Sequence, residues 1–375
     1  MELVVTLRTL GIRDVFNICA SLRSKGKKVV DAHIGAPSHD PPVPLKKAVE
    51  EAMNRISDIG TSYKPFLGMA ELREEIAKFH KRYLGQEVGP DQIFVTCGGA
   101  HALYLALKFF SGKKGLIPVP SFPHHFMQPE TLGIKAVYYN PAAESLVEEV
   151  LAKLDGETSF VLVNYPHNPT GFYPNCDELL QLHEELKKRK IALINDVVYH
   201  EIYYEERPPF PGDILVNSFS KSFNLPGLRL GYVCWNYEGV EKAGKLVYMT
   251  TAGTSDLAQA TVLVMLKKLT ESYFEEVRKY YAEKRDLLDT AFSELDFQYP
   301  RPKGAFYFFL KHKKLQNSNE LALRLLKEDR KACVGIVPGS AFRGGSNQFR
   351  VSFGKITRED AELMVEELKR ELEGR

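Results

Sequence analysis

The stretch VNSFSKSFNLPGLRLGY, residues 216–232, decides how the rest of the chain is interpreted. It places two cations, Lys221 and Arg229, close to the hydroxyl residues Ser218 and Ser220. Hydroxyls and a guanidinium bind a phosphate through fixed hydrogen bonds. A lysine near another cation and out of water has a disfavoured ammonium form, so its amine can attack an aldehyde. The stretch predicts an anion site with one nucleophilic amine; the alternative is a surface lysine in a serine-rich turn.

Composition excludes several broad classes of protein. Hydrophobic residues make up 44% and charged residues 26% of the 375 positions, which is typical of a globular protein. This length favours two domains, or one large domain with a smaller lobe. A net charge of +2 gives no electrostatic reason to expect nucleic-acid binding. No stretch approaches the roughly 20 apolar residues of a membrane span, and residues 1–14 make a poor signal peptide.

The cysteines and histidines give no metal or disulfide signal. The five cysteines are scattered, odd in number and form no C-x-x-C pair. His124 and His125 are neighbours whose side chains diverge, and no nearby carboxylate or cysteine completes a metal set. We therefore expect no metal site, and a reducing cytoplasmic location fits the cysteine pattern best.

A second candidate anion site comes earlier in the chain. Residues 92–96 read as a strand, Gly98 and Gly99 follow, and residues 100–110 read as a helix. Free backbone N–H groups point outward where a helix begins, so a strand, two glycines and a helix start form a seat for an anion. The pattern is neither G-x-G-x-x-G nor a Walker loop, which disfavours a dinucleotide or a nucleoside triphosphate.

Polar residues also follow two buried strands. The apolar run 159–163 precedes N-P-T-G, which begins at Asn168, and the strand 191–195 precedes Asp196. A carboxylate at the carboxyl end of a buried strand lies where α/β folds bind ligands. Asn-Pro and Thr-Gly are also turn formers, so N-P-T-G alone is equally compatible with a simple turn.

The run S-F-S-K-x-x-N-L-x-G-x-R-L-G resembles the lysine signature of class I/II aminotransferases, which use pyridoxal phosphate (PLP). N-P-T-G, D-V-V-Y and Y-x-P-x-x-G-x-x-E-L resemble further family motifs and occur in the family's order. Val197 departs from the pattern, since many relatives have glutamate there. The resemblance implies an α/β fold with a three-layer α-β-α large domain, built on a mostly parallel, mixed seven-stranded sheet over residues 41–270. Both chain termini, residues 1–40 and 271–375, would form a smaller α+β domain.

The same resemblance assigns the cofactor site. PLP would be covalently attached to Lys221. Asp196, supported by His125, would pair with the pyridine nitrogen, while Phe122 would stack on the ring. Asn168 and Tyr199 would donate to the phenolic oxygen. The phosphate would be held by Gly99, Ala100, Ser218, Ser220, Arg229 and Tyr63.

Substrate and partner follow from the resemblance as well. The substrate carboxylate would meet Arg350, with the Gly35 backbone and Asn168 beside it. Glycine allows such a close approach. Tyr63 stands in the segment that crosses a dimer interface in the family, so the resemblance implies a homodimer in which Tyr63 reaches the other subunit's site.

The activity implied is transfer of an amino group from an L-amino acid to a 2-oxo acid, with 2-oxoglutarate the expected acceptor, by a ping-pong mechanism. Lys221, Asp196 and Tyr199 would be the catalytic residues. Several relatives with acidic substrates carry lysine where Ala100 stands. Aromatic residues around Phe122 and Phe16 are compatible with an apolar or aromatic donor, and an aspartate-type activity stays open.

Three other functions fit parts of the pattern. A PLP-dependent lyase that eliminates a β-thiol would use the same cofactor motifs, because these do not fix which bond breaks. A ligand-sensing module of a transcription regulator would carry a DNA-binding domain, and no helix-turn-helix pattern precedes Gly35. An inactive structural dimer would not be expected to keep Lys221, Asp196 and Arg350 together.

Overall fold

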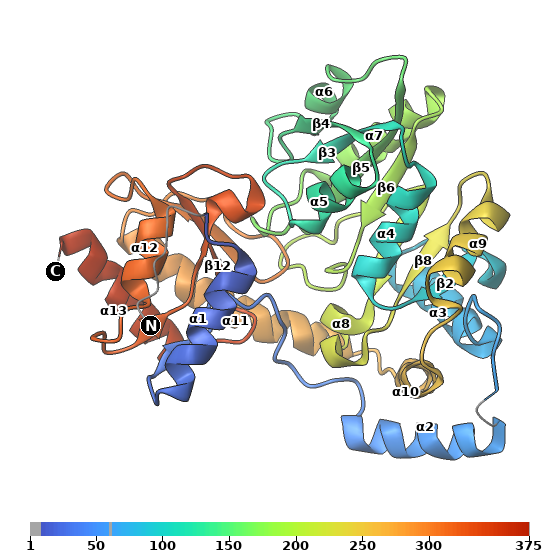
Figure 1. Cartoon of the computed structure of the whole chain (residues 1–375), viewed down its shortest axis with the longest axis horizontal. Coiled ribbons are helices and arrows are strands. Elements are labelled where there is room, and N and C mark those ends of the chain that lie inside the picture. The colour runs from blue at the N-terminus through green and yellow to red at the C-terminus, as the bar shows by residue number, and fades with distance from the viewer. Residues whose placement is uncertain (1–8, 60–61, 375) are drawn as a thin grey trace.

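The computed structural model describes residues 9–59 and 62–374, and its elements form two groups (Figure 1). The larger group surrounds a seven-stranded sheet whose order is β2 (Ile93–Thr96), β8 (Gly231–Trp235), β7 (Ile214–Ser218), β6 (Ala192–Asp196), β5 (Thr158–Asn164), β3 (Lys114–Pro118) and β4 (Lys135–Tyr139). Its helices are α2 (Leu45–Ile59), α3 (Ala70–Tyr83), α4 (Gly99–Phe109), α5 (His124–Thr131), α6 (Leu146–Leu151), α7 (Cys176–Lys188), α8 (Phe219–Ser222), α9 (Val240–Thr251) and α10 (Asp256–Lys267).

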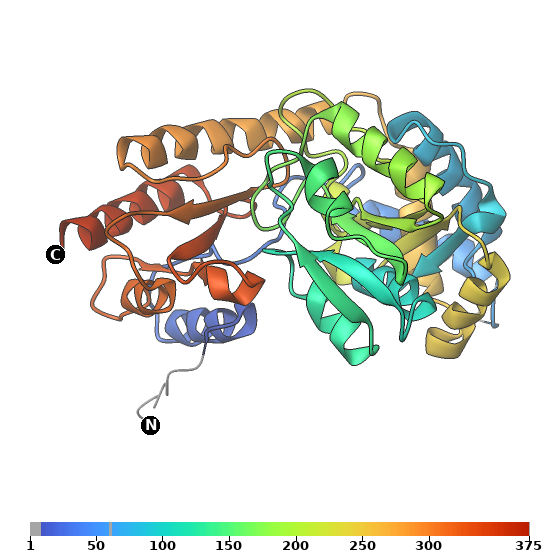
Figure 2. The ribbon, with the colours of Figure 1, turned by 90° about the horizontal axis from the view of Figure 1, so that it is seen from above.

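Helices cover both faces of this sheet, as Figure 2 shows. Successive side chains of β5 therefore enter different cores: Leu162 packs in the core that contains Leu103 of α4, and Val161 in the core that contains Leu182 of α7. A strand buried on both faces needs apolar residues at nearly every position. This explains the uninterrupted run F-V-L-V at residues 160–163.

Strand direction places the candidate site. β8 runs antiparallel to its neighbours β2 and β7, whereas the pairs β7–β6, β6–β5, β5–β3 and β3–β4 are parallel. The carboxyl ends of β2, β3, β5, β6 and β7 consequently meet at one edge of the sheet. The mostly parallel, mixed seven-stranded sheet predicted from the sequence is confirmed.

The smaller group draws on both ends of the chain (Figure 1). Its three-stranded antiparallel sheet has the order β11 (Val337–Pro338), β12 (Gln348–Ser352), β9 (Tyr307–Lys311), and β1 (Val29–Val30) pairs in parallel with β10 (Cys333–Val334). Its helices are α1 (Ile12–Ser24), α11 (Tyr273–Glu294), α12 (Ser318–Leu325) and α13 (Arg358–Glu373). The bounds predicted for the two domains stay a prediction.

Helix α11 joins the two groups along their length (Figure 2). Near its start, Phe274 stacks on Phe223 of the larger group, with ring centroids 6.0 Å apart. Near its end, Phe292 packs edge-on against Phe308 of β9 at 5.1 Å. One helix thus carries apolar contacts to both groups, which holds β9 in place relative to the larger group.

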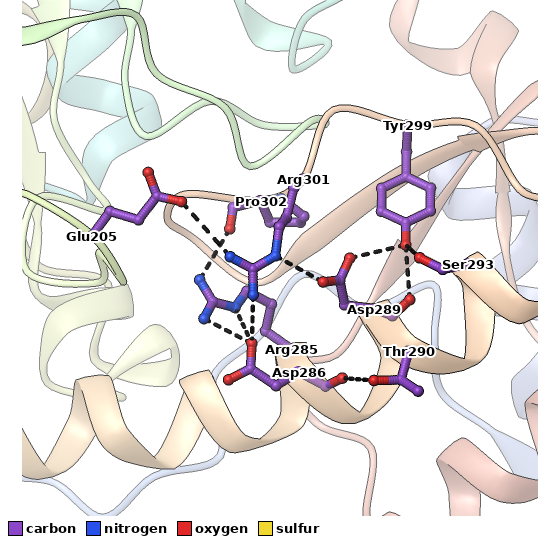
Figure 3. A network of polar contacts seen from close by, with 9 residues as sticks. All are labelled: Glu205, Arg285, Asp286, Asp289, Thr290, Ser293, Tyr299, Arg301 and Pro302. Carbon is purple, nitrogen blue, oxygen red and sulfur yellow. Dashed lines mark hydrogen bonds and ion pairs between the residues drawn. The ribbon is translucent and has the colours of Figure 1, made fainter.

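A polar network fastens the segment before β9 to this helix (Figure 3). Arg301 pairs with Asp286 at 3.0 Å and Asp289 at 2.7 Å, both on α11, and with Glu205 of the larger group at 3.8 Å. Arg285 donates to the Pro302 carbonyl at 3.4 Å. The exposed ion pairs contribute little free energy each, but together they hold the segment that leads into β9.

The sequence of residues 27–34 and of residues 334–338 also predicts one strand each, and both predictions were wrong in extent. The strand expected over residues 27–34 is reduced to Val29–Val30, because only these residues pair with β10. The strand expected over residues 334–338 divides into β10 and β11, which belong to different sheets. They divide at Gly335, where an added Cβ would lie 2.5 Å from His33 Nδ1. Within residues 9–59 and 62–374, no helix is long and apolar enough to cross a membrane.

Candidate active site

A cavity of about 320 Å³ lies at the carboxyl edge of the large sheet, closed on its other side by residues of the smaller group. It is lined by Ile12, Gly35, Gly99, Phe122, His125, Asn164, Asn168, Asp196, Val198, Tyr199, Ser218, Ser220, Lys221, Pro226, Arg229, Tyr307 and Arg350. All the site residues predicted from the sequence line this cavity, except Ala100 and Tyr63. The site therefore follows from topology: β2, β3, β5, β6 and β7 each end beside it, and β9 and β12 face them.

The cavity carries an excess of positive charge. Lys221, Arg229 and Arg350 line it, and none of the three forms an ion pair with a carboxylate among the residues that the structure describes. The carboxylate in the lining is that of Asp196, whose ion-pair partner is His125. Cations held together without counter-ions favour anionic ligands. A phosphate and a carboxylate, the two anions expected from the sequence, fit this charge.

Lys221 projects from α8, directly after β7. Its Nζ donates to the Gly35 carbonyl at 2.5 Å, and its side chain is partly buried. Removal from water, together with the smaller effect of the nearby guanidinium groups of Arg350 and Arg229, lowers the pKa of Lys221 to about 8, while Asp196 acts in the opposite direction. About a tenth of this amine is consequently neutral at pH 7 and about half at pH 8, so it can act as a nucleophile or general base.

Asp196 ends β6 and is held by a relay of hydrogen bonds. His125 Nε2 lies 2.9 Å from Asp196 Oδ2, and His125 Nδ1 lies 2.7 Å from Ser121 Oγ. The second carboxylate oxygen accepts from the Val198 N–H at 3.3 Å. A carboxylate fixed in this way presents a negative charge in one direction, which suits a protonated ring nitrogen.

The phosphate seat combines two strand ends and a helix start. Ser218 Oγ donates to Ser220 Oγ at 2.9 Å, and Gly99 begins α4, whose first N–H groups have no intrahelical acceptor. Gly98 has φ +81°, and a Cβ there would lie 2.6 Å from an Arg229 terminal nitrogen. The absence of a side chain at Gly98 thus leaves space beside the Arg229 guanidinium. This donor set fits a phosphate.

Arg350 occupies the opposite end of the cavity. It is 2% exposed and lies on β12. One terminal nitrogen donates to the His33 carbonyl at 2.7 Å and the other to Asn168 Oδ1 at 3.0 Å. Its Nε has no hydrogen-bond partner within residues 9–59 and 62–374, and burial lowers the pKa of the guanidinium. A buried donor without an acceptor is costly, so the site is suited to a ligand carboxylate.

Tyr307 is a site residue that the sequence analysis missed. Its hydroxyl lies 2.6 Å from that of Tyr199, and its ring lies under the Arg350 guanidinium at 4.6 Å. The only sequence signal was a tyrosine in the aromatic run 306–309, which reads as ordinary strand core. Ile12 and Asn164 also line the cavity without having been assigned a role.

The two predicted residues outside the lining, Ala100 and Tyr63, have different surroundings. Ala100 is the second residue of α4, so its N–H belongs to the unsatisfied first turn. Tyr63 is 97% exposed and lines a separate surface cavity with residues 251–254. Within this chain, Tyr63 does not reach the cavity that contains Lys221.

Residues 27–368 match the model of the family described as aminotransferase class I and II, and the chain belongs to that family. It is a PLP-dependent aminotransferase. The α/β fold, the cavity at the strand ends and the family match agree with the resemblance found in the sequence.

Individual relatives point the same way. An aspartate aminotransferase of Pyrococcus abyssi is 31% identical, over 91% of this chain and 90% of its own length. An aromatic-amino-acid aminotransferase of Thermococcus litoralis is 27% identical, over 91% and 90%. The structure of aspartate aminotransferase from Thermus thermophilus with maleate superimposes with a TM-score of 0.87 and 27% identity, covering 97% of each chain.

Proposed function

We propose that this enzyme moves an amino group from an L-amino acid to a 2-oxo acid, with 2-oxoglutarate as acceptor, in two alternating half-reactions, and that PLP is covalently attached to Lys221. The observation that carries the proposal is the partly buried Lys221 amine, with its lowered pKa, in a cavity that also holds Asp196 and two unpaired guanidinium groups. A structural lysine would be expected to have a carboxylate partner or to face solvent.

The residues of the cavity divide between the parts of the cofactor. Ser218, Ser220, Arg229 and the N–H groups of Gly99 and Ala100 would hold the phosphate. Phe122, Asn168, Asp196 and Tyr199 would hold the ring and its polar substituents. When bound, PLP supplies an electron sink that weakens the bonds at the substrate Cα.

The chain's own groups would then bind the substrate and move its proton. Arg350 would bind the α-carboxylate through its planar guanidinium, which can donate two parallel hydrogen bonds to a carboxylate. Once the substrate amine has displaced Lys221 from the cofactor, the freed Lys221 amine would take the Cα proton and return a proton on the same side, because a pKa of about 8 allows both base and acid roles near neutral pH. Asn168 transfers no proton in this scheme; its Oδ1 accepts from Arg350 at 3.0 Å and so orients the guanidinium.

We also propose a homodimer in which Tyr63 reaches the partner's phosphate site. Three large side chains gather near one loop and remain exposed: Tyr63 at 97%, Met249 at 76% and Tyr248 at 62%. Phe66 links them, since its ring lies 5.6 Å from that of Tyr248. Apolar side chains gathered at a surface favour burial against another chain. The five unpaired cysteines support the proposed cytoplasmic location.

The test uses purified protein loaded with PLP. Amino donors of both classes in the relatives' names, acidic and aromatic, are mixed with it singly, first without and then with 2-oxoglutarate. We expect loss of the visible absorbance of the lysine-bound cofactor with a reactive donor, and its return when the oxo acid is added. Ammonia or thiol release without an oxo acid would favour a lyase instead.

A substitution tests the covalent link. Lys221→Ala is expected to lose this absorbance and to lower turnover at least about a thousandfold, because nucleophile and base are removed together. Lys303→Ala, outside the cavity, is the matched control and is expected to keep both properties. A Lys221→Ala protein with the absorbance and full turnover would overturn the assignment.

A further inference from the structure

We propose that Tyr307 is a positioning residue that fixes the Tyr199 hydroxyl and the Arg350 guanidinium at the same time. The inference rests on the proposed function, because it concerns the groups that would hold the cofactor ring and the substrate carboxylate. Tyr307 begins β9 in the smaller group, whereas Tyr199 follows β6 in the larger one. One side chain therefore links the two halves of the site.

The hydroxyl of Tyr307 is placed against that of Tyr199. The two oxygens are 2.6 Å apart, both side chains are buried, and the rings meet at 87°. Tyr199 has one O–H, which it would donate to the cofactor's phenolic oxygen. The Tyr307 O–H is then free to donate to the Tyr199 oxygen. Hydrogen bonds in such a chain strengthen one another.

Gly35 makes this placement possible. A Cβ at Gly35 would lie 2.5 Å from the Tyr307 oxygen, too close for any side chain. The Gly35 carbonyl also accepts from Lys221 Nζ. The glycine therefore lets Tyr307 approach while its own backbone meets the catalytic amine.

The ring of Tyr307 acts on Arg350. The guanidinium carbon lies 4.6 Å from the centroid of Tyr307 and 4.7 Å from that of Phe342. A guanidinium held between two rings keeps its plane, and its attraction to the ring faces is strong where water is excluded. The two terminal nitrogens are held by His33 and Asn168, so the ring contacts fix the remaining rotation and leave Nε available to a ligand.

The hydroxyl and the ring can be separated by substitution. Tyr307→Phe removes the O–H and keeps the ring under Arg350. Tyr307→Leu removes both. The matched control is Tyr139→Phe, which deletes a buried hydroxyl that donates to the Leu162 carbonyl at 2.7 Å and does not line the cavity.

The first measurement is the visible absorbance of the PLP-loaded protein as a function of pH. The Tyr307 O–H would strengthen the hydrogen bond that Tyr199 donates to the cofactor's phenolic oxygen, and that bond favours the anionic form of the oxygen. Loss of the Tyr307 O–H therefore disfavours release of a proton from the bound cofactor. We expect Tyr307→Phe and Tyr307→Leu to raise the pH of the spectral transition by roughly 0.5–1 unit, the size of one hydrogen bond. Tyr139→Phe is expected to leave the pH of the transition unchanged. A Tyr307→Phe transition at the wild-type pH would overturn the role of the hydroxyl.

The second measurement is the affinity for carboxylates that carry no amine, using succinate and 3-phenylpropanoate as probes. We expect Tyr307→Leu to weaken binding of whichever probe the wild type binds by about tenfold, as for loss of a buried cation–π contact. Tyr307→Phe is expected to retain wild-type affinity. Equal affinity in all three proteins would overturn the role of the ring. If Tyr307→Leu does not fold, Tyr307→Trp is measured instead. This variant keeps an aromatic face, so it is expected to bind the carboxylate probe as the wild type does.

These outcomes are distinct from failure of the proposed function. If the wild type neither binds PLP nor exchanges amino groups, the proposed function falls. If the wild type does both and the Tyr307 variants match it in spectral transition and in carboxylate affinity, only the inference about Tyr307 falls.

Discussion

Replacing Lys221 by methionine in the PLP-free protein is expected to change how stability depends on pH. The unperturbed pKa of lysine is 10.5, and burial lowers that of Lys221 to about 8. Between these two values the unfolded chain holds a proton that the folded chain has released. The free energy of unfolding of the wild type therefore rises with pH across this window, whereas below pH 8 the buried ammonium is a full cost to the fold.

The size of the effect follows from the difference between the two pKa values. A difference of about 2.5 corresponds to about 3.4 kcal/mol of destabilisation well below pH 8, at about 1.36 kcal/mol for each pKa unit. By pH 10 most of this cost has disappeared, because the folded lysine is then neutral. Water enters the cavity and weakens the effect, so we expect the wild type to gain about 2 kcal/mol between pH 7 and pH 10 relative to Lys221→Met.

The assay is urea denaturation of PLP-free wild type and Lys221→Met at both pH values, with protein concentration held constant because a dimer's stability depends on it. All other titrating groups are shared, so their contribution cancels in the difference between proteins. Lys46→Met is the control, since the Lys46 side chain is 90% exposed. Parallel pH dependences in wild type and Lys221→Met would refute a lowered lysine pKa.

Three further predictions concern the ligand sites. Arg350→Lys replaces a two-pronged carboxylate partner by a point charge, so succinate or 3-phenylpropanoate is expected to bind at least about tenfold more weakly by calorimetry, with the cofactor absorbance retained; unchanged affinity would contradict this. Gly98→Ala introduces a Cβ at φ +81° into the phosphate seat and is expected to weaken PLP binding about tenfold. The control is Gly112→Ala, at φ +76°, where an added Cβ would meet no described atom within 4 Å. It tests the backbone strain alone and is expected to leave PLP affinity unchanged. Tyr63→Phe is expected to bind PLP about fivefold more weakly, because one hydrogen bond is lost. Mixed dimers of one Tyr63→Phe subunit and one Lys221→Ala subunit are expected to regain one site of normal affinity. Mixed dimers that bind PLP only as weakly as Tyr63→Phe would show that Tyr63 contacts the site of its own subunit.

Much of the fold was predictable because its signals are local. The apolar runs of β5 and β6 are buried on both faces, and the polar residues that follow them, such as Asp196, stand at the ligand-binding edge for topological reasons. Strand extent was less predictable. Residues 27–34 look extended, yet only Val29 and Val30 find a partner, and that partner lies some 300 positions away on β10. Pairing over such a distance leaves no trace in local sequence.

The site was predictable where motif and strand end coincide, and Lys221, Asp196, Asn168 and Arg350 do line one cavity. Their chemical roles stay predictions. Tyr307 was not predictable, because alternation along β9 does not say which aromatic residue faces a ligand and which faces the core. Its importance depends on the missing side chain of Gly35, on Tyr199 and on Arg350, which only folding brings together.

The Lys221 amine lies on α8 in the larger group and the Arg350 guanidinium on β12 in the smaller group, and the position of one group against the other depends on α11 and on exposed ion pairs around Arg301. A small shift of one group relative to the other changes the distance between the amine and the guanidinium without unfolding a strand or a helix. A low concentration of chaotrope is therefore expected to abolish the enzyme's activity while its far-UV circular dichroism spectrum stays that of the native protein.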